Sequence, residues 1–273
     1  MAGKPVVPVF FLSGSTGISA ETMGNVLLIQ FPDLQFERRL FPFITTVDEA
    51  RRVVAILDAA VDGPVAPLVF STAAVDEIRE VLLTSRCPII DFFGLHMQKV
   101  EETLGVRGMR VAARPHGMGD LQRYNNRMQA VEFAMQHDDG QSLAALDKAE
   151  VILLAPSRCG KTPTTMYLAL QHGIFVANYP LVDEDFESVD LPRPLRKLRE
   201  RCFGILTDPE RLSQVRTERR TASRYASLEQ CTYELRRSAA MFRLHKVPTI
   251  NSSAASVEEM ATVILQWIKE RRS

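Results

Sequence analysis

Short apolar runs alternate with amphipathic stretches along most of the chain. Runs typical of buried strands lie at 6–12, 66–70, 87–92, 151–156, 174–177, 203–207 and 247–250, and a short, more polar strand is predicted at 37–42. Apolar residues at helical spacing predict helices at 20–31, 46–58, 74–85, 123–136, 228–245 and 256–271, with further helices opening near 161 and 208. This alternation predicts an α/β fold of mostly parallel sheets flanked by helices.

The length of the chain allows one large domain or two medium ones. At 273 residues there is enough sequence for a substantial core. A polar turn, His137-Asp138-Asp139-Gly140, interrupts the pattern before the strand at 151–156. We therefore predict an N-terminal α/β domain at 1–140 and a C-terminal domain at 141–273, which the loop described next marks as nucleotide-binding. One continuous sheet through both halves is the alternative.

The segment 157–162, Ser-Arg-Cys-Gly-Lys-Thr, has the layout of a phosphate-binding P-loop, because it joins a buried strand to a helix. Gly160 lets the backbone approach an anion closely. Lys161 can reach a terminal phosphate, and the Thr162 hydroxyl can ligate Mg²⁺. Arg158 adds a planar group suited to phosphate oxygens.

One position departs from the usual P-loop pattern of G-x-x-x-x-G-K-[ST]. Ala155 stands where the first glycine is usual, and Pro156 follows it. Because a proline disfavours helical backbone in the preceding residue, we expect the strand to run straight to Pro156 and to turn afterwards. The alternative is a strand, a turn and a capped helix that bind nothing.

Composition narrows the classes of function. Basic and acidic residues balance at 33 each, which argues against a nucleic-acid binder driven by bulk charge. The four cysteines are scattered without a C-x-x-C pair, which argues against a structural zinc site and a secreted disulfide scaffold. The apolar run at 6–12 is too short to span a membrane. We therefore expect a cytoplasmic protein that binds neither membrane nor nucleic acid.

Other polar positions could carry chemistry. Asp208 ends an apolar strand, where P-loop proteins place a Mg²⁺-binding carboxylate, but it could equally cap the next helix. His137 and Asp138 could supply a general base, or form a solvated turn. Three further candidates are an anion site at 13–17, a loop histidine at His116 and a basic cluster at 218–225. The first is explained as well by an ordinary βα turn, and ordinary loop or surface structure is the more common explanation for the other two.

Several motifs occur together and in a fixed order. They are Ser157–Thr164, His137–Gly140, Ala177–Pro180, Asp208–Leu212, Ser223–Cys231 and Pro248–Ser252. Together they resemble the bacterial phosphoenolpyruvate synthase regulatory proteins, which are relatives of the pyruvate, phosphate dikinase regulatory proteins. The resemblance covers essentially the whole chain and is strongest from His137 onward.

The resemblance implies an unusual bifunctional enzyme. Members of this family use ADP to phosphorylate a threonine of their target enzyme, which inactivates that enzyme. They reverse the modification with inorganic phosphate, and this reaction releases pyrophosphate. The implied partner is phosphoenolpyruvate synthase, or alternatively pyruvate, phosphate dikinase, and we expect a homodimer. The implied ADP-binding residues are Ala155, Pro156, Ser157, Arg158, Cys159, Gly160, Lys161 and Thr162. The candidate catalytic residues are Lys161, Asp208, His137 and Asp138, with Thr162 on Mg²⁺.

Two departures from the family pattern and two other functions stay open. The family loop usually opens with Gly-Val, where this chain has Ala155-Pro156, and Gly14 replaces an aspartate in the first loop. An ATP-dependent P-loop kinase for a small metabolite would also explain the motif at 157–162. A nucleotide-sensing module without catalysis is the third possibility, although the intact Lys161-Thr162 pair argues against it.

Overall fold

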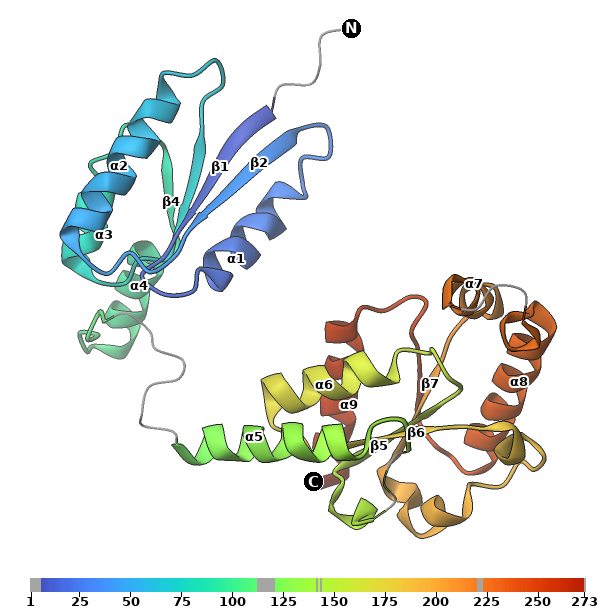
Figure 1. Cartoon of the computed structure of the whole chain (residues 1–273). Coiled ribbons are helices and arrows are strands. Elements are labelled where there is room, and N and C mark those ends of the chain that lie inside the picture. Colours follow the sequence, from blue (N-terminus) through green and yellow to red (C-terminus); the bar gives the residue numbers. More distant parts are fainter. Residues whose placement is uncertain (1–5, 112–120, 141, 143, 220–222, 273) are drawn as a thin grey trace, which may run out of the picture. The chain divides into compact units, whose positions relative to one another are not determined.

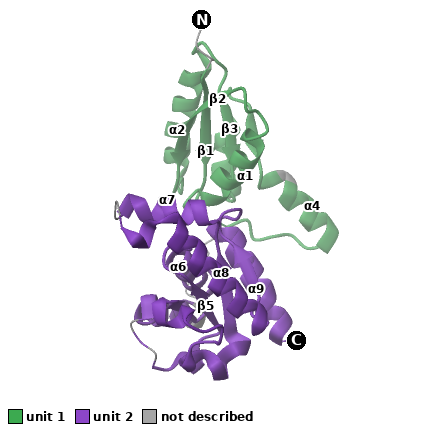
Figure 2. Cartoon of the chain, turned by 90° about the vertical axis from the view of Figure 1, so that its right-hand side faces the viewer, with its two compact units in different colours: residues 1–117 green, residues 118–273 purple. Residues whose placement is uncertain are grey.

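The protein consists of two compact units, residues 1–117 and 118–273 (Figures 1 and 2). The computed structural model describes residues 6–111, 121–140, 142, 144–219 and 223–272. Each unit is built on a parallel four-stranded sheet, so the predicted α/β class with flanking helices is confirmed, and the alternative of one continuous sheet is wrong. No helix among the described residues is both long and apolar enough to cross a lipid bilayer.

Unit 1 has helices on both faces of its sheet. Its elements are β1 (Val6–Leu12), α1 (Ile18–Leu28), β2 (Gln35–Phe41), α2 (Val47–Val61), β3 (Leu68–Ser71), α3 (Asp76–Leu82), β4 (Ile89–Asp91) and α4 (Gly94–Leu104). The strand order is β2-β1-β3-β4. Val9 and Phe11 of β1 pack in one cluster with α1, whereas Phe10 and Leu12 pack in another with α2 and α3. Alternate residues of β1 therefore face opposite layers.

Unit 2 repeats this arrangement around β5. Its strands are β5 (Val151–Ala155), β6 (Val176–Pro180), β7 (Cys202–Leu206) and β8 (Thr249–Asn251), in the order β6-β5-β7-β8. Its α-helices are α5 (Leu121–Gln136), α6 (Lys161–His172), α7 (Pro209–Arg219), α8 (Leu228–Leu244) and α9 (Val257–Arg272). Short 3₁₀ helices are η2 (Asp138–Gly140), η3 (Leu146–Lys148), η4 (Asp183–Phe186), η5 (Arg193–Arg201) and η6 (Arg224–Ala226).

The central strand β5 is apolar throughout because helices and loops cover both of its faces. All five of its residues are 0% exposed. Val151 and Leu153 pack in the cluster that includes α6 and α9, which contact each other, whereas Ile152 and Leu154 pack with residues of α5 and α8. Since all four strands are parallel, their carboxyl ends share one edge, where the loop after β5 lies.

Local signals for helix ends agree with the structure. Thr46 caps α2 in a capping box with Glu49. Gly173 ends α6 with φ +66°. Ser256 and Glu259 exchange the hydrogen bonds of a capping box at the start of α9. Predicted and observed ends of strands and helices mostly differ by only a few residues.

Two segments differ from the sequence interpretation. The units divide at 117/118, and α5, which lies before the predicted boundary at 140/141, packs against α6 of unit 2. The proline-containing stretch between β6 and β7 forms η4 and η5, and it buries Phe186, Leu191 and Leu195 against the sheet. Isolated apolar residues between prolines carry no periodic signal, so the pattern missed this packing layer.

Candidate active site

The loop after β5 turns sharply before α6. The strand ends at Ala155, as Pro156 leads one to expect, and the turn follows. Arg158 has φ +74° and Gly160 has φ +93°. Positive φ is uncommon for a residue with a side chain, and strained backbone of this kind concentrates at functional loops. Glycine is the residue that adopts the Gly160 conformation without strain.

The N-terminus of α6 offers free hydrogen-bond donors. Gly160 is its N-cap, and no side chain caps it. Pro163 has no N–H, so the free amides of this turn are those of Lys161 and Thr162. Backbone amides at a helix N-terminus, together with the helix dipole, favour a bound anion.

Lys161 is a buried cation at the centre of this loop. Its side chain is 3% exposed, and its Nζ donates to the carbonyls of Ala155 at 3.1 Å and Pro156 at 2.9 Å. Burial lowers the pKa of Lys161 to about 8, against an opposing effect of neighbouring acidic groups that include Asp138 and Asp139. The lysine has no carboxylate partner within hydrogen-bonding distance in the described chain. A phosphate would supply the missing negative charge.

Thr162, Asp138 and Asn178 form a hydrogen-bonded group beside the loop. The Thr162 hydroxyl donates to Asp138 Oδ1 at 3.0 Å. The Asn178 side-chain amide, which is buried in β6, donates to the same carboxylate oxygen at 2.5 Å and to Thr162 Oγ1 at 3.1 Å. Asn178 Oδ1 is buried without a hydrogen-bond partner. The tertiary structure thus brings together one carboxylate, one hydroxyl and one amide oxygen.

Oxygen ligands of this kind suit Mg²⁺. A hydroxyl has one hydrogen and two lone pairs, and Thr162 uses the hydrogen on Asp138 and one lone pair on Asn178. One lone pair of Thr162 and the unpartnered Oδ1 of Asn178 remain. These residues therefore fit the predicted role of Thr162 as a magnesium ligand.

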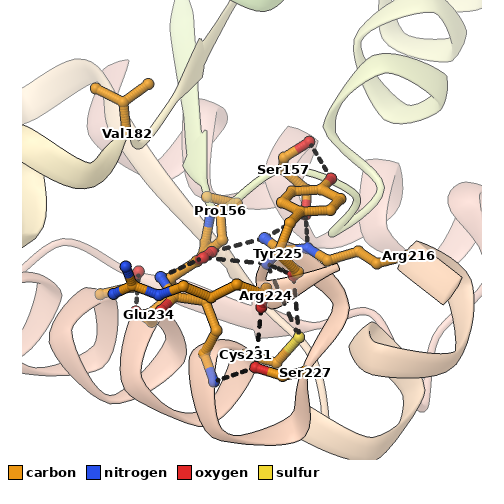
Figure 3. Close-up of polar contacts among 12 residues, drawn as sticks. Pro156, Ser157, Val182, Arg216, Arg224, Tyr225, Ser227, Cys231 and Glu234 are labelled. Carbon is orange, nitrogen blue, oxygen red and sulfur yellow. Dashed lines mark hydrogen bonds and ion pairs between the residues drawn. The ribbon is translucent and has the colours of Figure 1, made fainter. Parts of the chain in front are cut away.

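A buried ion pair between α7 and α8 also holds the loop, through contacts with Ser157 (Figure 3). Arg216 of α7 is 0% exposed and pairs with Glu234 of α8 at 2.6 and 3.1 Å. The same guanidinium donates to the Ser157 carbonyl at 3.1 and 3.3 Å, and it lies over the Tyr225 ring at 4.2 Å. The Tyr225 hydroxyl donates to Ser157 Oγ at 3.0 Å. Ser157 is thereby fixed through its main chain and its side chain.

The other predicted site residues lie in different surroundings. His137 is buried, and its two ring nitrogens face the carbonyls of Phe133 and Ala144 at 2.8 and 2.6 Å, so it holds the turn before β5. Asp208 is exposed, and its carboxylate accepts from Asn251 at 3.1 Å. Neither side chain hydrogen-bonds to Lys161 or Thr162. Burial raises the pKa of the Cys159 thiol to about 12, so this buried side chain of the loop is uncharged at neutral pH.

Three remaining candidates lie elsewhere. The residues 13–17 line a hollow of about 260 Å³ in unit 1 together with Thr72 and Phe92. His116 falls outside the described residues, as do residues 220–222 of the basic cluster. Arg224 and Tyr225 of that cluster form part of η6.

Sequence reasoning assigned no role at the site to Asn178, Arg216 or Glu234. Asn178 left a signal, because it is an amide within a buried strand. Arg216 follows Leu212 by four residues, which places both on the buried face of α7. A charged residue on an apolar helical face calls for a buried partner, but only the packing of α7 on α8 identifies that partner as Glu234.

The whole chain can be compared with known proteins. A family model described as kinase/pyrophosphorylase matches residues 9–265. The chain belongs to this family. A relative from Bordetella pertussis is 42% identical over 95% of both chains, and one from Legionella pneumophila is 40% identical over 94% of this chain and 95% of its own. A third, from Ralstonia nicotianae, is 41% identical over 100% of this chain and 98% of its own. Each is named "Putative phosphoenolpyruvate synthase regulatory protein".

Membership places the site in a family of phosphoryl-transfer enzymes. For kinase/pyrophosphorylase chemistry, a protein must hold phosphate groups, neutralise their charge and orient a nucleophile. The amides of α6, Lys161 and the Asp138 group lie within one loop region of unit 2, and their chemistry suits these three tasks. All of them come from residues 138–178, within the matched range.

Proposed function

We propose that this kinase/pyrophosphorylase regulates phosphoenolpyruvate synthase by reversible phosphorylation of a threonine. ADP is the phosphoryl donor of the inactivating reaction. Inorganic phosphate is the acceptor of the reactivating reaction, which releases pyrophosphate. The names of the full-length relatives support the target, and the family description supports the reaction type. The observation that carries the chemistry is the position of Asp138 beside Thr162, at the start of the helix that carries Lys161.

Three residues of the loop, together with Asn178 of β6, have roles in this reaction. The amides of Lys161 and Thr162 and the Lys161 ammonium group bind the phosphate oxygens and neutralise their charge. Arg158 adds a guanidinium group at the rim. Thr162, with Asn178 Oδ1, would hold Mg²⁺, which when bound neutralises phosphate charge and orients the diphosphate.

Asp138 is the best placed group to handle the proton. Its Oδ1 accepts from Thr162 and Asn178, whereas its Oδ2 has no partner in the described chain. The residue is half-buried, so an incoming hydroxyl can reach it. In the forward direction Asp138 accepts the proton of the target threonine as that oxygen attacks, and in the reverse direction it returns the proton. Asp208 stays a prediction as a catalytic or Mg²⁺-binding carboxylate.

The direct test follows the label of ADP. The protein is incubated with Mg²⁺, purified phosphoenolpyruvate synthase and ADP that carries ³²P in its β-phosphate. We expect the label on a threonine of the synthase, and its release as pyrophosphate when inorganic phosphate is added. Label in the α-phosphate of ADP should stay in AMP. A parallel incubation with pyruvate, phosphate dikinase decides between the two targets. Transfer from ATP to a small metabolite, with no label on either protein, would overturn the proposal.

Asp138→Asn tests the proposed base. Asparagine keeps the shape and the contact with Thr162 but cannot accept a proton, so we expect kcat to fall about 10²–10⁴-fold in both directions. ADP binding, measured by calorimetry, should change much less because Lys161 and the loop amides remain. The matched control is Asp147→Asn, at an exposed position. A kcat of Asp138→Asn equal to that of the control would exclude Asp138 as the base.

A further inference from the structure

A second hollow lies on the flank of the loop opposite Asp138. It has a volume of about 260 Å³ and is lined by Arg158 and Gly160 of the loop, Thr207 and Arg211 after β7, and Ser252 after β8, among others. Asn178, which contacts Asp138, lies in β6. Because β5 lies between β6 and β7 in the sheet, the Asp138 group and the hollow flank the loop on different sides.

The hollow contains two cationic groups that make no hydrogen bond or ion pair with a described residue. Its lining includes the guanidinium groups of Arg158 and Arg211 and contains neither aspartate nor glutamate. Both arginines are exposed, and neither makes a hydrogen bond or an ion pair with a described residue. Two planar cations around one small hollow suit a phosphate group, whose oxygens accept paired N–H donors.

The walls of the hollow are fixed before any ligand arrives. Thr207 Oγ1 and Ser253 Oγ are 2.8 Å apart and share a hydrogen bond, and the amide of Asp208 donates to the same serine at 2.8 Å. Ser252 donates to the Leu206 carbonyl from its amide at 2.8 Å and from its hydroxyl at 3.2 Å. The loops after β7 and β8 are therefore tied together, so the hollow is preformed.

The position in the sheet is one that favours ligands. The chain runs from β5 outward to β6 and then crosses to β7 on the other side of β5. Open α/β sheets bind ligands beyond the carboxyl ends of the strands, at the point where the strand order reverses. The hollow lies at that point, between the loops after β5 and β7.

The geometry of in-line phosphoryl transfer indicates which group the hollow binds. The attacking oxygen and the leaving oxygen lie on opposite sides of the transferred phosphorus. If the target threonine approaches on the Asp138 side, the phosphate that is not transferred lies on the other side. We propose that the hollow binds this phosphate group, with Arg211 as a binding residue that the loop motif does not contain. In the forward direction it is the α-phosphate of ADP, and in the reverse direction it is inorganic phosphate.

The forward and the reverse reaction can both use this one phosphate site. In the forward direction the threonine oxygen bonds to the β-phosphorus, the bond from the bridging oxygen to that phosphorus breaks, and the electron pair stays on the phosphate of AMP. The threonine proton passes to Asp138. In the reverse direction an oxygen of inorganic phosphate bonds to the phosphorus of phosphothreonine, the bond to the threonine oxygen breaks, and that oxygen takes up a proton. The positive charge of Arg158 and Arg211 stabilises the same oxygen in both directions.

Arg211→Gln tests the assignment of the hollow, which rests on the proposed function. Binding measured without any phosphoryl transfer separates a failure of the assignment from a failure of the proposed function. Calorimetry measures the Kd of the full-length chain for pyrophosphate, AMP and adenosine, and steady-state rates give KM for ADP and for inorganic phosphate. We expect Arg211→Gln to raise the Kd of pyrophosphate and AMP, and both KM values, roughly 10–100-fold, because a charged hydrogen bond is lost. Adenosine binding should not change, because adenosine has no phosphate.

Arg243→Gln is the matched control. Arg243 is also exposed, but it lies near the end of α8, just before the amino end of β8, whereas the hollow lies at the carboxyl ends of the strands. Control-like Kd and KM values in Arg211→Gln would overturn the assignment, and so would a rise in KM for ADP with an unchanged KM for phosphate. If no protein is phosphorylated from ADP but pyrophosphate still binds and Arg211→Gln weakens it, the proposed function fails and the phosphate site stands.

Discussion

A Lys161→Met variant is expected to lose phosphoryl transfer in both directions while unit 2 becomes no less stable. Lys161 is the buried cation of the loop, and in the proposed mechanism both directions pass negative charge through the same place. Removing one preorganised charge from a site of this kind costs about 10²–10³-fold or more in rate. Methionine keeps the length of the side chain and removes only its charge and its hydrogen bonds.

The stability of this variant follows from the pKa of Lys161. Burial lowers that pKa from 10.5 to about 8 in the folded protein. The charged lysine therefore destabilises the fold at pH 7, and methionine should change the free energy of unfolding by between zero and about +2 kcal/mol. Between pH 8 and 10.5 the unfolded chain binds more protons at Lys161 than the folded chain. The wild type should therefore gain stability with rising pH across that window relative to the variant.

The measurements are single-turnover rates in both directions and denaturant unfolding followed by the fluorescence of Trp267. This is the one tryptophan in the sequence, and it packs against Phe203 in unit 2, so it reports on the unit that contains the site. Lys148→Met, at an exposed position, is the control. Phosphorolysis at the wild-type rate in Lys161→Met would show that the two reactions do not share this site. A loss of stability of several kcal/mol would show that Lys161 is a structural residue.

An Arg216→Met variant should be strongly destabilised, and a second substitution should restore stability but not activity. Removing Arg216 leaves the Glu234 carboxylate buried without its partner, at a cost of about 3–5 kcal/mol. Replacing both residues, in Arg216→Met/Glu234→Leu, removes both buried charges, which is often neutral or stabilising. The Ser157 carbonyl nevertheless still lacks its two N–H donors from Arg216. We therefore expect the double variant to fold and still transfer phosphoryl groups at least about tenfold more slowly.

Unfolding of the single and double variants, read from Trp267, and rates of transfer from ADP separate the two effects. The control is Arg196→Met, because Arg196 and Asp190 form an exposed ion pair in the same unit, with side chains 56% and 58% exposed. Removing a pair of that kind costs about 0–1 kcal/mol. Wild-type activity in the double variant would mean that the ion pair serves only the stability of α7 and α8. Wild-type stability in Arg216→Met alone would contradict the burial argument.

The fold class could be predicted because parallel sheets covered on both faces need uninterrupted apolar strands. The 151–155 run is such a strand, and it is the centre of the second sheet. The end of that strand was also local information, because Pro156 restricts Ala155. The division of the chain was not local. Helix α5 reads like any amphipathic helix, and only its packing on α6 assigns it to unit 2.

The site shows the same distinction. The sequence by itself determined the segment 155–162, since a buried strand, a glycine that adopts positive φ and a lysine at the first turn of a helix are consecutive in the chain. It could not rank Asp138 above His137 or Asp208, because rank depends on which side chain has a free oxygen next to Thr162.

Only the tertiary structure decided those partners. Hydrogen bonds connect Asp138 with Thr162 and Asn178 across 24 and 40 positions of sequence, and Arg216 contacts Ser157 across 59. No periodic pattern encodes contacts between residues so far apart in the sequence. These contacts form because parallel strands bring their carboxyl ends together on one side of the sheet. Local backbone chemistry therefore fixed the conformation of the loop at 155–162, and sheet topology fixed the groups around it.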